Sequence, residues 1–468
     1  MQKVLGHVAA VLKGILFTGI SLQILLGLVW LCCNFSNVPP FGESLFLLRL
    51  SETLRCDEYT GILYPLFLKL VCRNHYLVYA VQLAVAYVAG RRFLQILRPA
   101  GKAMAVWGSL ALLTIPMALQ CHLAVLPCSF AASLLLFQLS FLLEMSGTAE
   151  KRTLKQLAAL SVCWLLLSLL LPEYLFLGTV AVLSAFFVCL REWKGQYRKA
   201  GYGLLLLGAF LGMILAVDSL TQTVGLYGKA QKSPVLALTG RMAWTNLRRD
   251  AEEWPEELEN LVEEGILLDS SFYPDNMELL FYPAVEQAVG VERSRELFLE
   301  MAEIAWHRHS TMILREMAWD VLGYTASPIL LQVQLTGEGY DSSSPRNYEL
   351  LLYHTPVLSK YYMDYGSWWF CMAVILTILL QGCAAIEDRG RMKAGALWQI
   401  FFCLLTAGVL VVWYTMQGAG IMDYKNTIWI DELWLAWTLL LLREERGREL
   451  LSNSGAHCNG RIGKRRRE

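Results

Sequence analysis

Two adjacent carboxylates, Asp57 and Glu58, stand a few residues before the segment "YPLFLKL", which runs from Tyr64 to Leu70. A carboxylate within hydrogen-bond reach of a hydroxyl or amine can take its proton and act as a general base. The segment that follows is short and amphipathic, so it is able to lie along a membrane interface. The pair therefore suits activation of an acceptor at a membrane surface. The alternative is a solvated surface pair, which is the commoner reason for adjacent acids in an outer loop.

Four cationic or titratable side chains flank this pair in the sequence, namely Arg55, Lys69, Arg73 and His75. Guanidinium and ammonium groups bind phosphate through charge-assisted hydrogen bonds, so these residues could hold a lipid phosphate at headgroup depth. The stretch would then combine a base with a phosphate site, which suits transfer of a sugar from a lipid phosphate to an acceptor. The same cations are also ordinary interfacial anchors, whose charged ends reach the headgroups whatever the protein does.

Other polar residues lie at the expected outer edges of apolar segments. Glu173 in "LLLPEYLF" could face the same cavity or mark a polar turn. His354 could contact a lipid phosphate where the chain returns to the membrane, although interfacial anchoring is the commoner role. Gln120 and His122 occupy another turn, and a lone histidine there is more often structural. Glu432 lies near the edge of the last apolar segment, where a carboxylate is costly unless it is paired or wet.

Several catalytic classes lose their sequence support. The chain has no Walker loop, no GxGxxG after a strand, no GxSxG and no HExxH, which argues against nucleotide hydrolysis, redox and metalloprotease chemistry. Its twelve cysteines are scattered along the chain, apart from the adjacent Cys32 and Cys33, and none has metal-ligand spacing. We expect no cofactor, and a divalent metal is possible but not favoured. The basic end "RIGKRRRE" follows an apolar segment and is explained by the positive-inside bias, so no nucleic-acid partner is expected.

The elements that must position these residues are apolar helices. Of the 468 residues 56% are hydrophobic and 17% are charged, and runs such as residues 14–33 match the length of a membrane-crossing helix. The fold class we expect is an all-α polytopic membrane protein with about ten transmembrane helices. The apolar runs lie near residues 11–33, 76–90, 103–120, 123–145, 156–171, 174–190, 201–219, 366–386, 396–416 and 428–442.

The loops after every second span are basic, as at residues 91–102 and 191–199, which places them on the cytoplasmic side. Both termini are then cytoplasmic, in a multi-pass protein of the plasma membrane. The expected parts are an N-terminal transmembrane core, an outer loop within it, an extracytoplasmic domain, C-terminal transmembrane helices and a basic cytoplasmic tail. Their boundaries are 1–219, 34–75, 220–365, 366–442 and 443–468.

The expected extracytoplasmic domain is mainly helical. "RRDAEEWPEELENLVEEG" is acidic, with Pro255 near a helix start and Gly265 suited to a helix stop. Residues 294–324 carry apolar side chains at three- and four-residue steps, which predicts one or two amphipathic helices. Their apolar face packs either on the rest of this domain or on the lipid interface.

The order of these features resembles the GT-C superfamily of integral-membrane glycosyltransferases, which includes protein O-mannosyltransferases and the aminoarabinose transferases of lipid A. Members carry an acidic catalytic residue in the first outer loop, often as Asp-Glu, followed by an interfacial helix that often has a Tyr-Pro step. Here these features correspond to Asp57, Glu58, Tyr64 and Pro65. A core of several spans before an outer insertion, and a Pro-containing turn midway through the core, are also similar. The likeness covers roughly residues 10–220.

The resemblance implies a polyprenyl-phosphate-linked sugar as donor, membrane lipid around it, an acceptor that arrives from outside, and inversion at the anomeric carbon. Asp57 or Glu58 would be the base, and Tyr64 would lie in the substrate-binding region. The family often has an acid at the turn between the third and fourth spans, where this sequence has Gln120 and His122.

Three other functions remain open. A cell-surface polysaccharide polymerase or ligase also combines about ten spans with a large outer loop, but it would place functional arginines in those loops. A transporter predicts charges in mid-span and broken helices in two corresponding halves, of which the sequence offers few signs. A non-enzymatic assembly subunit is the third alternative.

Overall fold

A computed structural model describes most of the first 325 residues. The described residues are 2–36, 43–54, 61–96, 102–147, 153–171, 175–192, 197–224, 234–250, 254–263, 265 and 281–325, with short pieces between 357 and 380 and between 432 and 439. Within these ranges the regular structure is helical and no strand occurs, which confirms the expected helical class. The predicted C-terminal spans and basic tail lie mostly outside the described residues.

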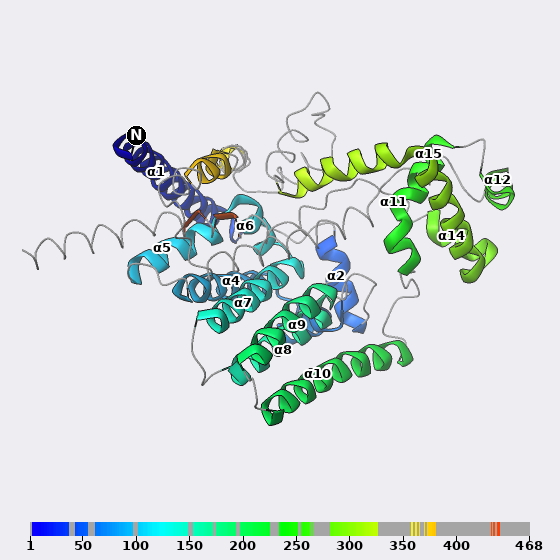
Figure 1. The fold of residues 1–468 in the computed structure, drawn as a ribbon, viewed down its shortest axis with the longest axis horizontal. Helices are drawn as coiled ribbons and strands as arrows, with labels where there is room; N and C mark the ends of the chain where they lie inside the picture. Colours follow the sequence, from blue (N-terminus) through cyan, green and yellow to red (C-terminus); the bar gives the residue numbers. More distant parts are fainter. Residues whose placement is uncertain are drawn as a thin grey trace, which may run out of the picture.

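The N-terminal part consists of apolar helices that pack side by side (Figure 1). Three of them are long and apolar enough to cross a membrane, by length and composition, over Gly6–Asn34, His75–Ile96 and Tyr197–Thr221. The helices of this part are α1 (Gln2–Asn34), α4 (His75–Ile96), α5 (Lys102–Leu113), α6 (Pro116–His122), α7 (Cys128–Gly147), α8 (Thr153–Leu170), α9 (Leu175–Glu192) and α10 (Tyr197–Thr223). The chain is thus a helical membrane protein, and the larger number of spans stays a prediction.

The predicted continuous span over residues 103–120 is wrong in one respect, because the structure divides it into α5 and α6. Pro116 begins α6, and the preceding residue, Ile115, has an extended backbone (φ −61°, ψ 124°). Proline disfavours the helical conformation in the residue before it and has no N–H to donate, so a helix ends there. The Thr114 hydroxyl donates to the Leu110 carbonyl at 2.8 Å and remains satisfied at the break.

Buried amide side chains tie these helices together. Gln23 Nε2 on α1 donates to the Ala111 carbonyl on α5 at 3.1 Å. Gln82 Nε2 on α4 donates to the Leu126 carbonyl, just before α7, at 2.9 Å. Because an apolar surrounding offers no competing water, such hydrogen bonds fix how the helices are placed along one another.

Two short helices follow α1, namely α2 (Glu43–Thr53) and α3 (Leu63–Leu70), and they pack against each other. α3 contains the "YPLFLKL" segment, so this stretch is helical, as the family resemblance implies. Tyr64 and Leu68 turn inward while Lys69 and Leu70 are exposed. One face of α3 therefore belongs to the bundle core, and the other is open.

The second part contains α11 (Pro234–Arg249), α12 (Glu256–Glu263), α14 (Tyr282–Val289) and α15 (Val291–Thr325). Figure 1 shows these helices gathered to one side of the apolar ones. They have a small core of their own, in which Trp244, Leu258 and Phe298 are buried. α12 begins after Pro255 and Gly265 has a φ of +73°, as the sequence predicts. α15 is interrupted at His309 (φ −124°, ψ 17°), so the predicted amphipathic segment forms two helical arms.

Candidate functional site

The start of α3 is held tightly against the end of α8. The backbone N–H of Gly61 donates to the Leu170 carbonyl at 3.0 Å. A Cβ at residue 61 would overlap the Leu169 carbonyl oxygen, so only glycine allows the two backbones to approach this closely. This contact joins Gly61, three residues after Glu58 in the sequence, to Leu170, three residues before Glu173.

Tyr64 supports this arrangement from inside the bundle. Its side chain is fully buried. The ring meets Phe130 of α7 edge-on at a centroid distance of 6.2 Å, and Phe67 packs on the same phenylalanine at 4.9 Å. Such edge-to-face pairs add to the free energy gained by burial. Tyr64 therefore anchors α3 to α7 from inside the bundle.

Two of the predicted phosphate-binding cations lie on the open side of α3. Lys69 is exposed on its last turn. Arg73 follows in a left-handed turn (φ +58°), and its Nη1 forms an ion pair with Glu52 Oε1 of α2 at 2.6 Å. Both partners are about half exposed, so this pair contributes little to stability. The free energy lost when Arg73 leaves Glu52 to bind another anion is therefore small.

His75 begins α4 and lies against aromatic rings. Its imidazole is 4.0 Å from the Tyr76 ring and 5.7 Å from the Tyr79 ring, centroid to centroid. The side chain of Asn74 caps this helix, because its Oδ1 accepts from the backbone N–H groups of Tyr76 at 3.1 Å and Leu77 at 3.3 Å. The structure thus brings Lys69, Arg73 and His75 to one short turn between α3 and α4.

The other predicted site residues lie outside the described residues. They are the carboxylates Asp57 and Glu58, together with Arg55, Glu173 and His354. Their proposed roles therefore stay predictions.

The turn between α6 and α7 holds a buried polar group that the sequence suggested was structural. His122 is fully buried, and its Nδ1 lies 2.8 Å from Ser129 Oγ. Burial lowers the pKa of His122 to about 4, so the ring is neutral near pH 7. Ser44 of α2 accepts from the Val125 N–H of the same turn at 3.2 Å. Sequence reasoning missed Ser44 and Gln82, although a polar residue in an apolar run is itself a signal.

The chain was compared with family models, curated proteins and solved structures. No family model, curated protein or solved structure matches the chain. Within the described ranges no group of three or more histidine, cysteine, aspartate or glutamate side chains is arranged to hold a metal ion.

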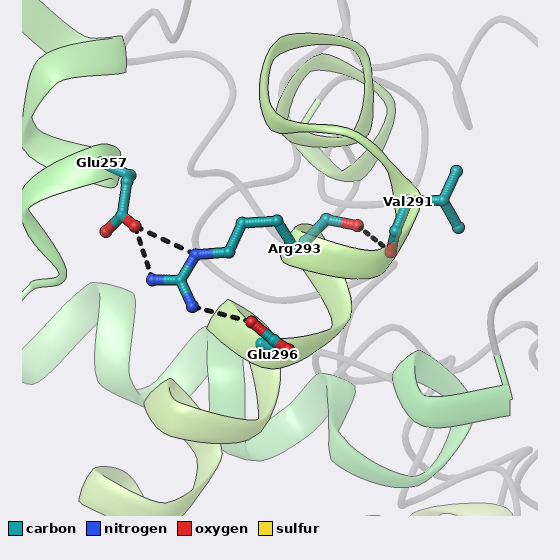
Figure 2. A network of polar contacts seen from close by, with 5 residues as sticks. Glu257, Val291, Arg293 and Glu296 are labelled. Atoms are coloured by element: carbon teal, nitrogen blue, oxygen red, sulfur yellow. Dashed lines mark hydrogen bonds and ion pairs between the residues drawn. The ribbon is translucent and has the colours of Figure 1, made fainter.

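The second part of the chain contains two charged networks, both missed from the sequence. In the first, Arg293 at the start of α15 donates through Nε to Glu257 of α12 at 3.0 Å and through Nη1 to Glu296 at 2.9 Å (Figure 2). The hydroxyl of Ser294 donates to the Val291 carbonyl at 2.9 Å. The hydrogen bond from Arg293 lowers the pKa of the Glu257 carboxyl. This network links α12 to α15.

The second network lies where α15 is interrupted. His309 Nε2 and Asp250 Oδ1 are 2.9 Å apart, and Arg308 Nη1 lies 3.7 Å from the same oxygen. Asp250 follows the last residue of α11, at the negative end of that helix dipole, where a carboxylate is unfavourable unless cations compensate it. No local signal marks this contact, because its partners are far apart in the sequence.

Proposed function

We propose that this protein is a membrane glycosyltransferase that moves a sugar from a polyprenyl-phosphate donor to an acceptor on the extracytoplasmic side. It would span the plasma membrane about ten times, with both termini in the cytoplasm. The single observation that carries the proposal is the tight contact of Gly61 with Leu170 at the start of α3, the helix whose other end presents Lys69 and Arg73.

That contact matters because both acids are close to it in the sequence. In the sequence, Glu58 precedes Gly61 by three residues and Glu173 follows Leu170 by three residues. We propose that the two acids act near the Gly61–Leu170 contact. Lys69 and Arg73 follow on the exposed side of α3 and its adjoining turn. The proposal requires that the base and the second carboxylate act at the start of α3, and that Lys69 and Arg73 act from its other end.

The proposed reaction is a single displacement. The carboxylate of Asp57 or Glu58 takes the proton from the acceptor hydroxyl or amine as that atom bonds to the anomeric carbon. The bond from this carbon to the phosphate oxygen breaks, and the lipid phosphate leaves with the electron pair. Lys69 and Arg73 would stabilise the departing phosphate, and a phosphate needs no strong general acid in order to leave.

The decisive experiment replaces each carboxylate by its neutral isostere, as Asp57→Asn and Glu58→Gln. Sugar transfer from a polyprenyl-phosphate donor is measured in detergent for each variant. Loss of the general base should lower the rate about 10²- to 10⁴-fold in one of them. Glu292→Gln, an exposed acid on α15, is the matched control and should transfer at the wild-type rate. Full activity in both outer-loop variants would refute the proposal.

A further inference from the structure

The strained backbone of the described chain is concentrated around one ion pair. Only three non-glycine residues in the described ranges have a positive φ, namely Leu54 (+54°), Cys72 (+54°) and Arg73 (+58°). L-residues rarely adopt this left-handed conformation, because the Cβ then crowds the backbone and costs free energy. Leu54 follows Glu52 by two residues, and Glu52 is the partner of Arg73. All three unusual conformations therefore lie beside the Glu52–Arg73 contact.

Hydrogen bonds hold Arg73 in this conformation. The backbone N–H of Arg73 donates to the Leu68 carbonyl at 2.8 Å, and that of Cys72 donates to the Lys69 carbonyl at 3.1 Å, which closes the end of α3. This is the Schellman arrangement, whose left-handed position is usually occupied by glycine. Strain that the surrounding structure maintains is a sign of a functional position. The turn thus fixes the backbone from which the Arg73 side chain extends.

The surface around Arg73 combines positive charge with exposed apolar side chains. Lys69 is exposed on the last turn of α3, and Leu66 and Leu70 on the same helix face are 41% and 74% exposed. A free phosphate would use only the cations, whereas a phosphate on an apolar chain would also cover the two leucines. This side of α3 therefore fits a lipid phosphate.

Glu52 already occupies the guanidinium group that this ligand needs. Glu52 Oε1 lies 2.6 Å from Arg73 Nη1, and the two side chains are 59% and 48% exposed. A carboxylate and a phosphate accept the same charge-assisted hydrogen bonds from arginine, so they compete for it. We propose that Glu52 is an internal competitor, which occupies Arg73 until a lipid phosphate displaces it. The identity of the anion rests on the proposed function, whereas the competition is a property of α2 and the turn after α3.

The exposure of the pair sets the size of the effect. Exposed ion pairs contribute little to stability, so Arg73 is divided between a state bound to Glu52 and a free state. The apparent affinity for phosphate is reduced by the fraction of molecules in which Arg73 is free. Removing the competitor should therefore tighten phosphate binding about two- to fivefold.

The test measures binding of radiolabelled farnesyl phosphate to the full chain in detergent. Glu52→Gln keeps the size of the side chain and removes its charge, so binding should tighten by that factor. Arg73→Gln should weaken binding about tenfold, because the phosphate loses charge-assisted hydrogen bonds. In the Arg73→Gln background, Glu52→Gln should have no further effect. Equal tightening in that background would show that Glu52 only repels the anion from nearby, and would overturn the inference.

Two further probes test the chemistry of the ligand. Farnesyl phosphate should bind more tightly than inorganic phosphate, because it also covers the exposed leucines of α3. Binding of farnesol, which has the apolar chain without the anion, should be the same in wild type and Glu52→Gln. Equal affinities for farnesyl phosphate and inorganic phosphate would overturn the assignment of a lipid and leave a site for free anions.

The controls separate this inference from the proposed function. Glu292→Gln, an exposed acid on α15, should bind farnesyl phosphate as wild type does. Glu52→Gln should unfold near the wild-type temperature, because it loses only an exposed ion pair. Wild-type affinity in Glu52→Gln would overturn the competition and leave the proposed base untouched. Full sugar transfer by both Asp57→Asn and Glu58→Gln would refute that base, while the effect of Glu52 on binding would still stand.

Discussion

At the scale of single residues, Gly61 occupies a position where the packing leaves no room for a side chain. Its missing side chain lets the start of α3 approach the Leu169 and Leu170 carbonyls. The contrast is Gly208 on α10, where an added Cβ would meet nothing within 4 Å. Two glycines in apolar surroundings thus have different importance, and only the spatial contact distinguishes them.

Gly61→Ala should destabilise the protein by about 1–3 kcal/mol, because the new methyl group forces two backbone segments apart. Sugar transfer should fall with it, since α3 moves away from α8. The measurement is the unfolding temperature of the purified variant together with its transfer rate.

Gly208→Ala is the matched control for that variant. Alanine is the better helix former and meets no neighbour there, so the unfolding temperature should stay the same or rise slightly. Equal stability of the two alanine variants would contradict the close approach at Gly61.

At the scale of helices, two breaks shape the molecule for different reasons. The α5–α6 break has a local cause, because Pro116 cannot continue a helix. The α15 break at His309 has no proline or glycine nearby, and its cause is tertiary, since His309 contacts Asp250 of α11. The Arg293 network then attaches α12 to the first arm of α15.

The Arg293 network predicts how the attachment of α12 depends on pH. The pKa of Glu257 is lower in the folded protein, chiefly through its hydrogen bond from Arg293. A depressed carboxyl pKa contributes stability above the unfolded-state value of about 4.3, and this contribution is lost as pH falls through the folded value. Hydrogen exchange in α12 should therefore accelerate, relative to the rest of the domain, on acidification below that range.

Glu257→Gln keeps the shape of the side chain but removes its charge. The exchange of α12 should then lose this relative pH dependence, while its protection near pH 7 falls only slightly, because exposed ion pairs contribute little. Glu292→Gln, an exposed acid one residue from Arg293, is the control and should retain the wild-type dependence. A variant Glu257→Gln with unchanged acid sensitivity would show that another group controls the attachment.

At the scale of the whole molecule, the chain has an apolar helical part and a more polar helical part with a separate core. The alternation of basic loops predicts that the polar part and the outer loop share the extracytoplasmic side. The proposed function requires this arrangement, because base and acceptor must meet outside the membrane.

Cysteine labelling tests this orientation. In intact cells a membrane-impermeant thiol reagent should modify Ser343→Cys in the outer domain and should leave Ser452→Cys in the basic tail unmodified. Native cysteines that react must first be replaced, and both variants should label after the cells are opened. The reverse pattern in intact cells would overturn the orientation and, with it, an external base at Asp57 or Glu58.

The sequence by itself determined the helical class, the apolar helices and the helix start at Pro255, whereas the break at Pro116 was not predicted. The three predicted features follow from hydrophobic periodicity and proline chemistry, which act over a few residues. Only the tertiary structure decided that Gly61 meets Leu170, that Tyr64 is buried against Phe130, and that Asp250 meets the break at His309. Each of these contacts joins residues tens of positions apart, so no local pattern records it, and its energy comes from packing and burial that exist only once the helices have assembled.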